Sequence, residues 1–169
     1  MLMILLRSIH VVLGALWVGI AVFVAFFLMP SLKEIGPDAN KVMVALQKRG
    51  MVTFVPAIAI LTLLSGIGLL WKVSSGFGAE YMGSHMGMAL STGALAAIVG
   101  WTIGMTIVAP SMYKAATMSQ ALPTITAEAE RNAQLATIMQ LRARGAAGGR
   151  WTAILLLVAV LFMAVARYV

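Results

Sequence analysis

The chain has no cysteine and few charged residues, with 5 acidic and 12 basic side chains among 169 residues. The absence of cysteine excludes structural disulfides, thiolate metal sites and cysteine nucleophiles. Charged residues make up 10% of the chain, against about 25% in soluble domains, which excludes an ordinary water-soluble fold. Hydrophobic residues make up 62%, whereas disordered chains lack the apolar content that drives burial. The composition therefore indicates a membrane protein.

Sequence motifs of the common enzyme classes are absent as well. The chain has no GxSxG motif, no P-loop, no dinucleotide fingerprint and no HExxH motif. Its apolar stretches contain no Asp or Glu, so a hydrolytic or proton-coupled transport site is hard to build here. The sequence leaves open whether the chain is a membrane redox enzyme.

Four apolar stretches organise the chain, and they cover residues 4–29, 51–71, 86–111 and 151–168. A helix needs roughly 20 residues to cross the hydrocarbon core of a bilayer, so each stretch is long enough to span it. We therefore expect an all-α fold: a polytopic membrane four-helix bundle, surrounded by lipid, with short cytoplasmic helical connections. Residues 1–169 would form a single transmembrane domain.

The basic residues are unevenly distributed between the two sides of this bundle. The connections 31–50 and 112–150 hold 9 of the 12 Lys and Arg, whereas the other side has Arg7, Lys72 and Arg167. Basic loops are retained in the cytoplasm, so both termini are expected outside the inner membrane. The formal charge of +7 then reflects membrane orientation and predicts no nucleic-acid partner.

The second connection is expected to contain a cytoplasmic helix at residues 126–144. Its apolar residues recur at helical spacing: Leu135, Ile138, Met139 and Leu141. Gly145, Gly148 and Gly149 are expected to end this helix before the last span. A short repeat, Pro30-Ser31 and Pro110-Ser111, suggests parallel two-helix repeats, although such short matches also arise by chance.

The only two histidines, His10 and His85, fall near the outer ends of spans 1 and 3. An ionisable group inside a bilayer is costly and usually has a partner or a function. Imidazoles from two facing helices are suitable axial ligands for haem iron, so we expect haem b between these spans. A histidine near a helix end also commonly bonds a neighbouring helix or the headgroups, and the sequence does not distinguish these alternatives.

The residues near each histidine fit a haem site. Gly14 and Ala89 each follow a histidine by four residues, and their small side chains would leave room for a flat macrocycle. Small residues also allow ordinary close packing of helices. Arg7, one turn outward of His10, would pair with a haem propionate. Trp17 would pack against the cofactor or belong to the ordinary core.

Two alternatives require no haem. Met82, His85 and Met86 would share one helical turn, and thioether with imidazole is a ligand set suited to Cu(I) in a copper-binding or transport protein. With 13 methionines in the chain, such clusters also arise by chance. The second alternative is a cofactor-free accessory subunit of a homo-oligomer or a larger membrane complex.

Several phrases resemble the copper-resistance protein D superfamily of bacterial membrane proteins, to which HemJ-type protoporphyrinogen oxidases are similar. The phrases are Ser8-Ile9-His10-Val11-Val12-Leu13-Gly14-Ala15-Leu16-Trp17-Val18-Gly19, Pro30, Gln47-Lys48-Arg49-Gly50, Pro56 and Gly66-Ile67-Gly68, within about the first 110 residues. The resemblance implies a helical bundle in the bacterial inner membrane, with His10 able to bind haem b and with redox or copper-related roles.

The HemJ-type enzymes keep a lysine early in span 3, where this sequence offers His85. That departure argues against protoporphyrinogen oxidation and favours a six-coordinate haem with His85 as second ligand. Such a haem has no open axial position, so oxygen activation is not expected. We therefore expect a haem b protein with a role in electron transfer to or from a quinone or a periplasmic partner.

Overall fold

The computed structural model describes residues 1–36 and 39–169, without the side chain of Asn40. It is all-helical over these residues, and four helical segments are long and apolar enough to cross a membrane. These segments are Leu2–Ile35, Met51–Val73, His85–Thr124 and Glu128–Tyr168. The expected all-α bundle of four long apolar helices is confirmed, and it indicates a multi-pass membrane protein.

Two of the segments are built from several helical elements. The first contains α1 (Leu2–Phe23), the π-helical turn η1 (Val24–Leu28) and α2 (Met29–Ile35), and the third contains α6 (His85–Ile103), η3 (Gly104–Val108), α7 (Ala109–Ala121) and η4 (Leu122–Thr124). The other elements are α3 (Ala39–Lys48), α4 (Met51–Val73), α5 (Ala79–Gly83), α8 (Glu128–Val165) and η5 (Ala166–Tyr168).

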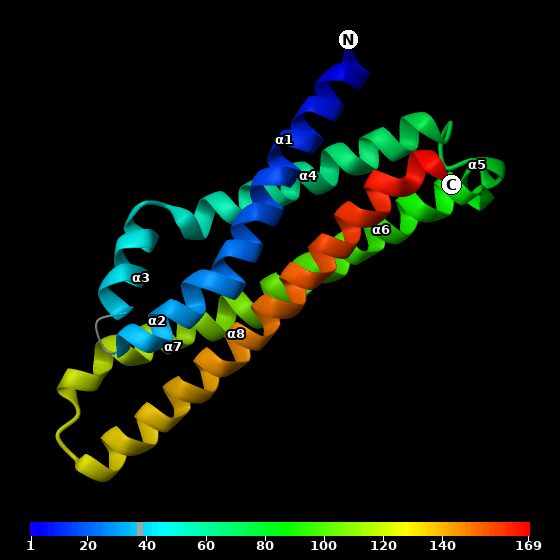
Figure 1. The fold of residues 1–169 in the computed structure, drawn as a ribbon. Helices are drawn as coiled ribbons and strands as arrows, with labels where there is room; N and C mark the ends of the chain where they lie inside the picture. The colour runs from blue at the N-terminus through cyan, green and yellow to red at the C-terminus, as the bar shows by residue number, and fades with distance from the viewer. Residues whose placement is uncertain (37–38) are drawn as a thin grey trace.

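The bundle consists of two long helical hairpins (Figure 1). In the first hairpin α1 packs along α4, and in the second α6 and α7 pack along α8. Both termini and α5 lie toward one end of the molecule, and α3 and the turn between α7 and α8 lie at the other (Figure 1). This arrangement places the two basic connections at the same end, as the charge distribution predicts.

The prediction of a helix break between residues 144 and 151 is wrong, because α8 runs without interruption through Gly145, Gly148 and Gly149. The first two of these glycines lie where α8 approaches the third segment closely. A Cβ at Gly145 would lie 3.0 Å from Sδ of Met112, and a Cβ at Gly148 would lie 3.1 Å from Cγ2 of Val108. These glycines permit close helix packing, which in a membrane bundle takes precedence over helix termination.

The two π-helical turns occupy matching positions in the two hairpins. Each begins six residues before a proline, η1 before Pro30 and η3 before Pro110. The shared local backbone structure adds to the short sequence repeat and supports two parallel two-helix repeats.

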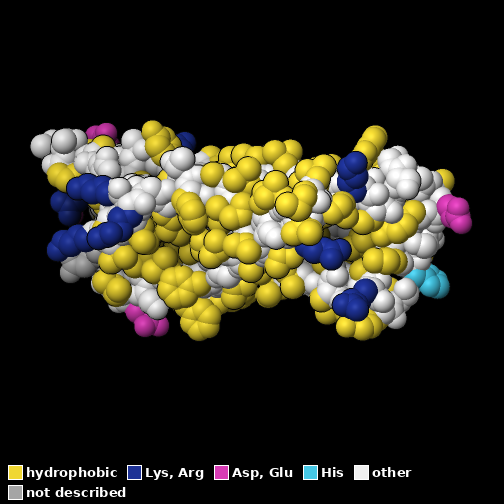
Figure 2. Space-filling view, turned by 90° about the horizontal axis from the view of Figure 1, so that it is seen from above, with side chains coloured by type: hydrophobic (Ala, Val, Ile, Leu, Met, Phe, Trp, Pro, Cys, Tyr) yellow, Lys and Arg dark blue, Asp and Glu magenta, His cyan; other side chains and the backbone are white. Residues whose placement is uncertain are grey.

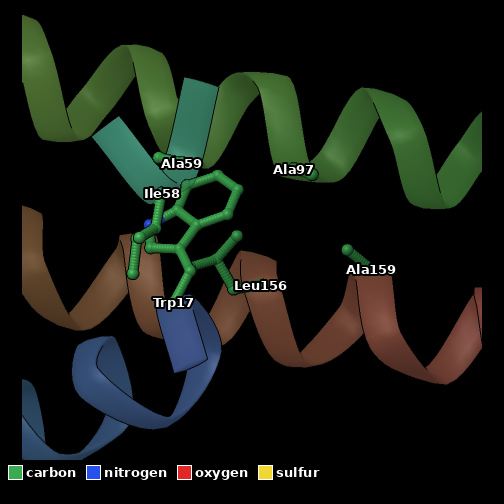
Figure 3. Close-up of a cluster of buried hydrophobic side chains, with 6 residues drawn as sticks. All are labelled: Trp17, Ile58, Ala59, Ala97, Leu156 and Ala159. Atoms are coloured by element: carbon green, nitrogen blue, oxygen red, sulfur yellow. The ribbon is translucent and has the colours of Figure 1, made fainter. Parts of the chain in front are cut away.

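The interior of the bundle is small and tightly packed. Each of the four long segments contributes to one cluster of buried side chains, which comprises Trp17, Ile58, Ala59, Ala97, Leu156 and Ala159 (Figure 3). Larger aliphatic side chains lie outside, over the middle of the molecule, while charged side chains lie toward its two ends (Figure 2). An apolar outer surface over a core of small residues suits a bundle whose solvent is lipid.

Candidate functional site

His10 lies on the side of α1 that faces α4, and it is half-buried. Its Nδ1 lies 2.8 Å from the backbone carbonyl oxygen of Thr62. A carbonyl oxygen only accepts hydrogen bonds, so Nδ1 carries the proton and donates it. In the neutral ring the lone pair is then on Nε2, which makes no hydrogen bond to the residues that the structure describes. The site thus offers one imidazole nitrogen as a ligand.

A glycine on α4 makes room for the imidazole ring. A Cβ added at Gly66 would lie 2.6 Å from Cε1 of His10, closer than non-bonded atoms approach. On α1, a Cβ at Gly14 would meet the methyl group of Thr62 at 3.4 Å. His10, Thr62 and Gly66 therefore form a fitted contact between the two helices, which we call the His10 site.

His85 is the first residue of α6, toward the end of the molecule that holds both termini, and it is exposed (Figure 1). The preceding residue, Ser84, caps the helix, since its Oγ accepts a hydrogen bond from the backbone N–H of Gly87 at 3.1 Å. His85 borders an open groove of about 560 Å³ between α6 and the end of the chain. The groove is lined by His85, Met88, Ala89, Thr92, Phe162, Val165 and Val169.

The structure does not place the two histidines around one cavity. His10 packs against α4, whereas the groove at His85 has no lining residue from α1. His10 lies about 10 Å of helix before Trp17 of the core cluster, and His85 lies about 18 Å of helix before Ala97 of the same cluster.

The other residues expected around the haem also lie apart. Arg7 is exposed in a shallow hollow formed by α1 alone, Trp17 is in the core with 4% of its surface exposed, and Ala89 is buried beside the groove at His85. Of the two expected haem ligands, His10 alone lies in a contact between two helices. The described residues do not provide a slot for a macrocycle between α1 and α6.

The prediction that Met82, His85 and Met86 share one helical turn is wrong. Ser84 has extended backbone angles, φ −72° and ψ 158°, which end α5 and start a new helix. Met82 therefore belongs to α5, while His85 and Met86 belong to α6. The carbonyl group of Tyr81 lies where a Cβ of Gly87 would be, so α5 folds tightly against the start of α6.

Two members of the His10 site were not identified from the sequence as members of a site. Thr62 contributes a backbone carbonyl, which no side-chain pattern reveals. Gly66 was noted only within the phrase that resembles a family. Within the described part of the chain, no group of three or more His, Asp or Glu residues is arranged to hold a metal ion. Two buried polar atoms there lack a hydrogen-bond partner, the Tyr81 hydroxyl and Nε1 of Trp101.

Comparison with known proteins adds no further assignment. No protein-family model matches the chain, and no curated protein or solved structure matches it.

Proposed function

We propose that this chain is a multi-pass membrane protein that binds haem b through His10 and takes part in electron transfer. The observation that carries the proposal is the hydrogen bond from Nδ1 of His10 to the Thr62 carbonyl oxygen, 2.8 Å long. Metal-binding histidines commonly donate their second N–H to a carbonyl group, which fixes the tautomer and the ring orientation. The same bond leaves Nε2 with the lone pair that iron requires.

The second hairpin supports a functional role for this contact beyond packing. There, Gly93 of α6 approaches α8 so closely that a Cβ would lie 3.0 Å from the carbonyl oxygen of Ala159. That close approach involves no imidazole. In the first hairpin a polar ring stands between the helices, and Gly66 accommodates it. Helix packing alone therefore does not require a histidine in this fold.

When bound, haem would supply a one-electron redox centre, while the chain's own residues would position it. Nε2 of His10 would bind the iron, the Thr62 carbonyl would hold the imidazole ring in place, and Gly66 would leave space for that ring. Arg7, one turn outward of His10, would be the residue for a propionate. His85 is not part of this proposal, because the groove at His85 has no lining residue from α1.

The visible absorption spectrum of the detergent-solubilised protein tests the proposal. We expect a b-type spectrum, lost in His10→Ala. The matched variant His85→Ala retains haem, and a change from low to high spin in it would identify His85 as second ligand. A colourless protein that does not take up added haem, or undiminished haem in His10→Ala, would contradict the proposal.

One observation favours a second candidate, a cofactor-free accessory subunit of a larger membrane complex. The centre of the bundle is filled by Trp17, Ile58 and Leu156, and the His10 bond itself joins two helices. Such a bundle needs no cofactor for its packing. A colourless, metal-free preparation that co-purifies with other membrane subunits would support this alternative. Copper found by metal analysis would contradict it and support a copper-binding protein instead.

A further inference from the structure

The groove at His85 begins beside a close contact between α6 and α8. A Cβ at Gly93 would lie 3.0 Å from the carbonyl oxygen of Ala159 and 3.4 Å from Cβ of Phe162. Phe162 also lines the groove, and so does Thr92, the residue before Gly93. The helix contact therefore bounds the groove at the Thr92 end. His85 lies on the same face of α6, about two helical turns or about 10 Å away, at the other end of the groove.

A side-chain hydrogen-bond donor is available to a ligand only at the His85 end of the groove. Thr92 donates its hydroxyl proton to the backbone carbonyl oxygen of Met88, at 2.8 Å, so it offers a ligand no donor. His85 makes no hydrogen bond to the residues that the structure describes, and a neutral imidazole has one N–H donor and one acceptor nitrogen. The other lining side chains are apolar. The groove therefore suits a molecule with an apolar body and a hydrogen-bonding head.

The head of such a ligand is expected to be uncharged. No Lys or Arg of the described residues lines the groove. Arg167, which is close to the groove along the chain, lies over the ring of Tyr168, with its Cζ 5.2 Å from the ring centroid. A phosphate or carboxylate head binds most strongly to charged donors, whereas one imidazole N–H suffices for a carbonyl oxygen. The lining thus favours a carbonyl head over that of a phospholipid.

The groove also lies where a ligand can enter from the lipid. Its α6 residues belong to a segment that is long and apolar enough to span a membrane. Tyr168, which follows the lining residue Val165 on the next helical turn, is 77% exposed. Tyr side chains are enriched where hydrocarbon meets headgroups. An apolar molecule dissolved in the bilayer therefore reaches the groove without passing through water, with its head near the membrane surface.

We propose that this groove binds an isoprenoid quinone, with the N–H of His85 donating a hydrogen bond to a quinone carbonyl oxygen. A quinone is uncharged, carries carbonyl oxygens on a flat ring and has an apolar chain that keeps it in the bilayer. Phe162 supplies an aromatic side chain for that ring to pack against. The groove volume of about 560 Å³ is typical of small-molecule sites. The role of the quinone as an electron carrier rests on the proposed electron-transfer function, but its binding does not require haem.

The test uses the full chain in phosphatidylcholine nanodiscs, titrated with an azido-substituted quinone that carries a decyl chain. After illumination, the cross-linked peptides are identified and counted by mass spectrometry, and we expect labelling near His85 and Phe162. The variant His85→Leu should bind roughly three- to tenfold more weakly, which corresponds to the loss of one hydrogen bond. The variant His85→Gln keeps an N–H donor and should retain binding.

A matched pair of threonine variants tests the groove itself. Thr92 and Thr102 are both exposed on α6, and each donates its hydroxyl proton to a carbonyl one turn earlier, but Thr102 does not line the groove. Thr92→Phe should fill the groove and abolish specific labelling, whereas Thr102→Phe should bind like the unaltered chain. Equal labelling of the two variants, or labelling that excess decylubiquinone does not reduce, would overturn the proposal.

A competitor and a haem measurement complete the test. If dioleoylglycerol displaced the azidoquinone as effectively as decylubiquinone does, the groove would be a general lipid site and the quinone assignment would be wrong. The haem content of the same preparations is measured from their visible spectra. A chain that binds quinone without haem would contradict the proposed function alone, and a chain that binds haem without specific quinone labelling would contradict this inference alone.

Discussion

Gly66 is the residue at which the contact between α1 and α4 depends most directly on a missing side chain. The variant Gly66→Ala should destabilise the protein by about 1–3 kcal/mol, because a methyl group would overlap the His10 ring and the packed helices can shift only slightly. Reversible unfolding in mixed micelles measures this change. The control is Gly19→Ala on α1, since a Cβ at Gly19 would meet nothing within 4 Å.

The same pair of variants tests the proposed function. If His10 binds haem, the haem content per chain should fall in Gly66→Ala and remain unchanged in Gly19→Ala. Equal stability of the two variants would show that the ring does not occupy the space above Gly66.

Ser75 has a backbone conformation that glycine adopts more easily. Its φ is 52°, in the left-handed region, which costs a residue with a side chain roughly 1 kcal/mol. The variant Ser75→Gly should therefore raise the melting temperature. The same change at Ser84, whose φ is −72° and whose hydroxyl caps α6, should lower the free energy of unfolding slightly, by about a few tenths of a kcal/mol. A loss of stability in Ser75→Gly would contradict the left-handed turn.

At the scale of single residues, the sequence identifies the candidate ligand, His10, but not the residues that surround it. His10 stands out because ionisable residues in apolar stretches are rare. Its partner is a backbone carbonyl of Thr62, and its space is provided by a glycine on another helix. Both depend on the relative rotation of α1 and α4, which the apolar composition of these helices does not specify.

The helices themselves are predicted well where long apolar runs define them and poorly where glycines interrupt them. The run 51–71 nearly coincides with α4 at Met51–Val73, because the thickness of a bilayer sets the minimum length of a span. The glycines after residue 144 suggest a helix end by the rules of soluble proteins. In α8 they lie inside a helix of 38 residues, because contact with the third segment selects small residues there.

Gly149 provides a test of this continuity. It lies inside α8, and a Cβ there would meet nothing within 4 Å, so Gly149→Ala should stabilise the protein by up to about 1 kcal/mol through helix propensity. Gly148→Ala should lower stability relative to Gly149→Ala, since its Cβ would press on Val108 and Ile107. Thermal unfolding of both variants measures the difference. If the helix ended at these glycines, Gly149→Ala would destabilise the chain instead.

The whole molecule is arranged along one axis, from an end with both termini to an end with most of the basic residues (Figures 1 and 2). At 1.5 Å per residue α8 is about 57 Å long, which exceeds the roughly 30 Å hydrocarbon core. The excess extends at the basic end, where α7 accompanies α8. A membrane would therefore enclose the core cluster and leave a helical hairpin in water on one side.

This arrangement predicts which side of the membrane each end occupies. The chain has no cysteine, so a single introduced thiol reports its own position without background. Thr126→Cys lies in the turn before α8, and Glu80→Cys lies in α5, and both positions are exposed. We expect an impermeant maleimide to label Glu80→Cys in intact spheroplasts and Thr126→Cys in inverted vesicles, because basic segments remain in the cytoplasm. A third variant, Leu2→Cys, should be labelled like Glu80→Cys, since the first two crossings return the chain at α5 to the side from which it started. Labelling of Leu2→Cys and Thr126→Cys from the same side would mean two crossings before α8, or none, instead of three, and the four-span arrangement would be wrong.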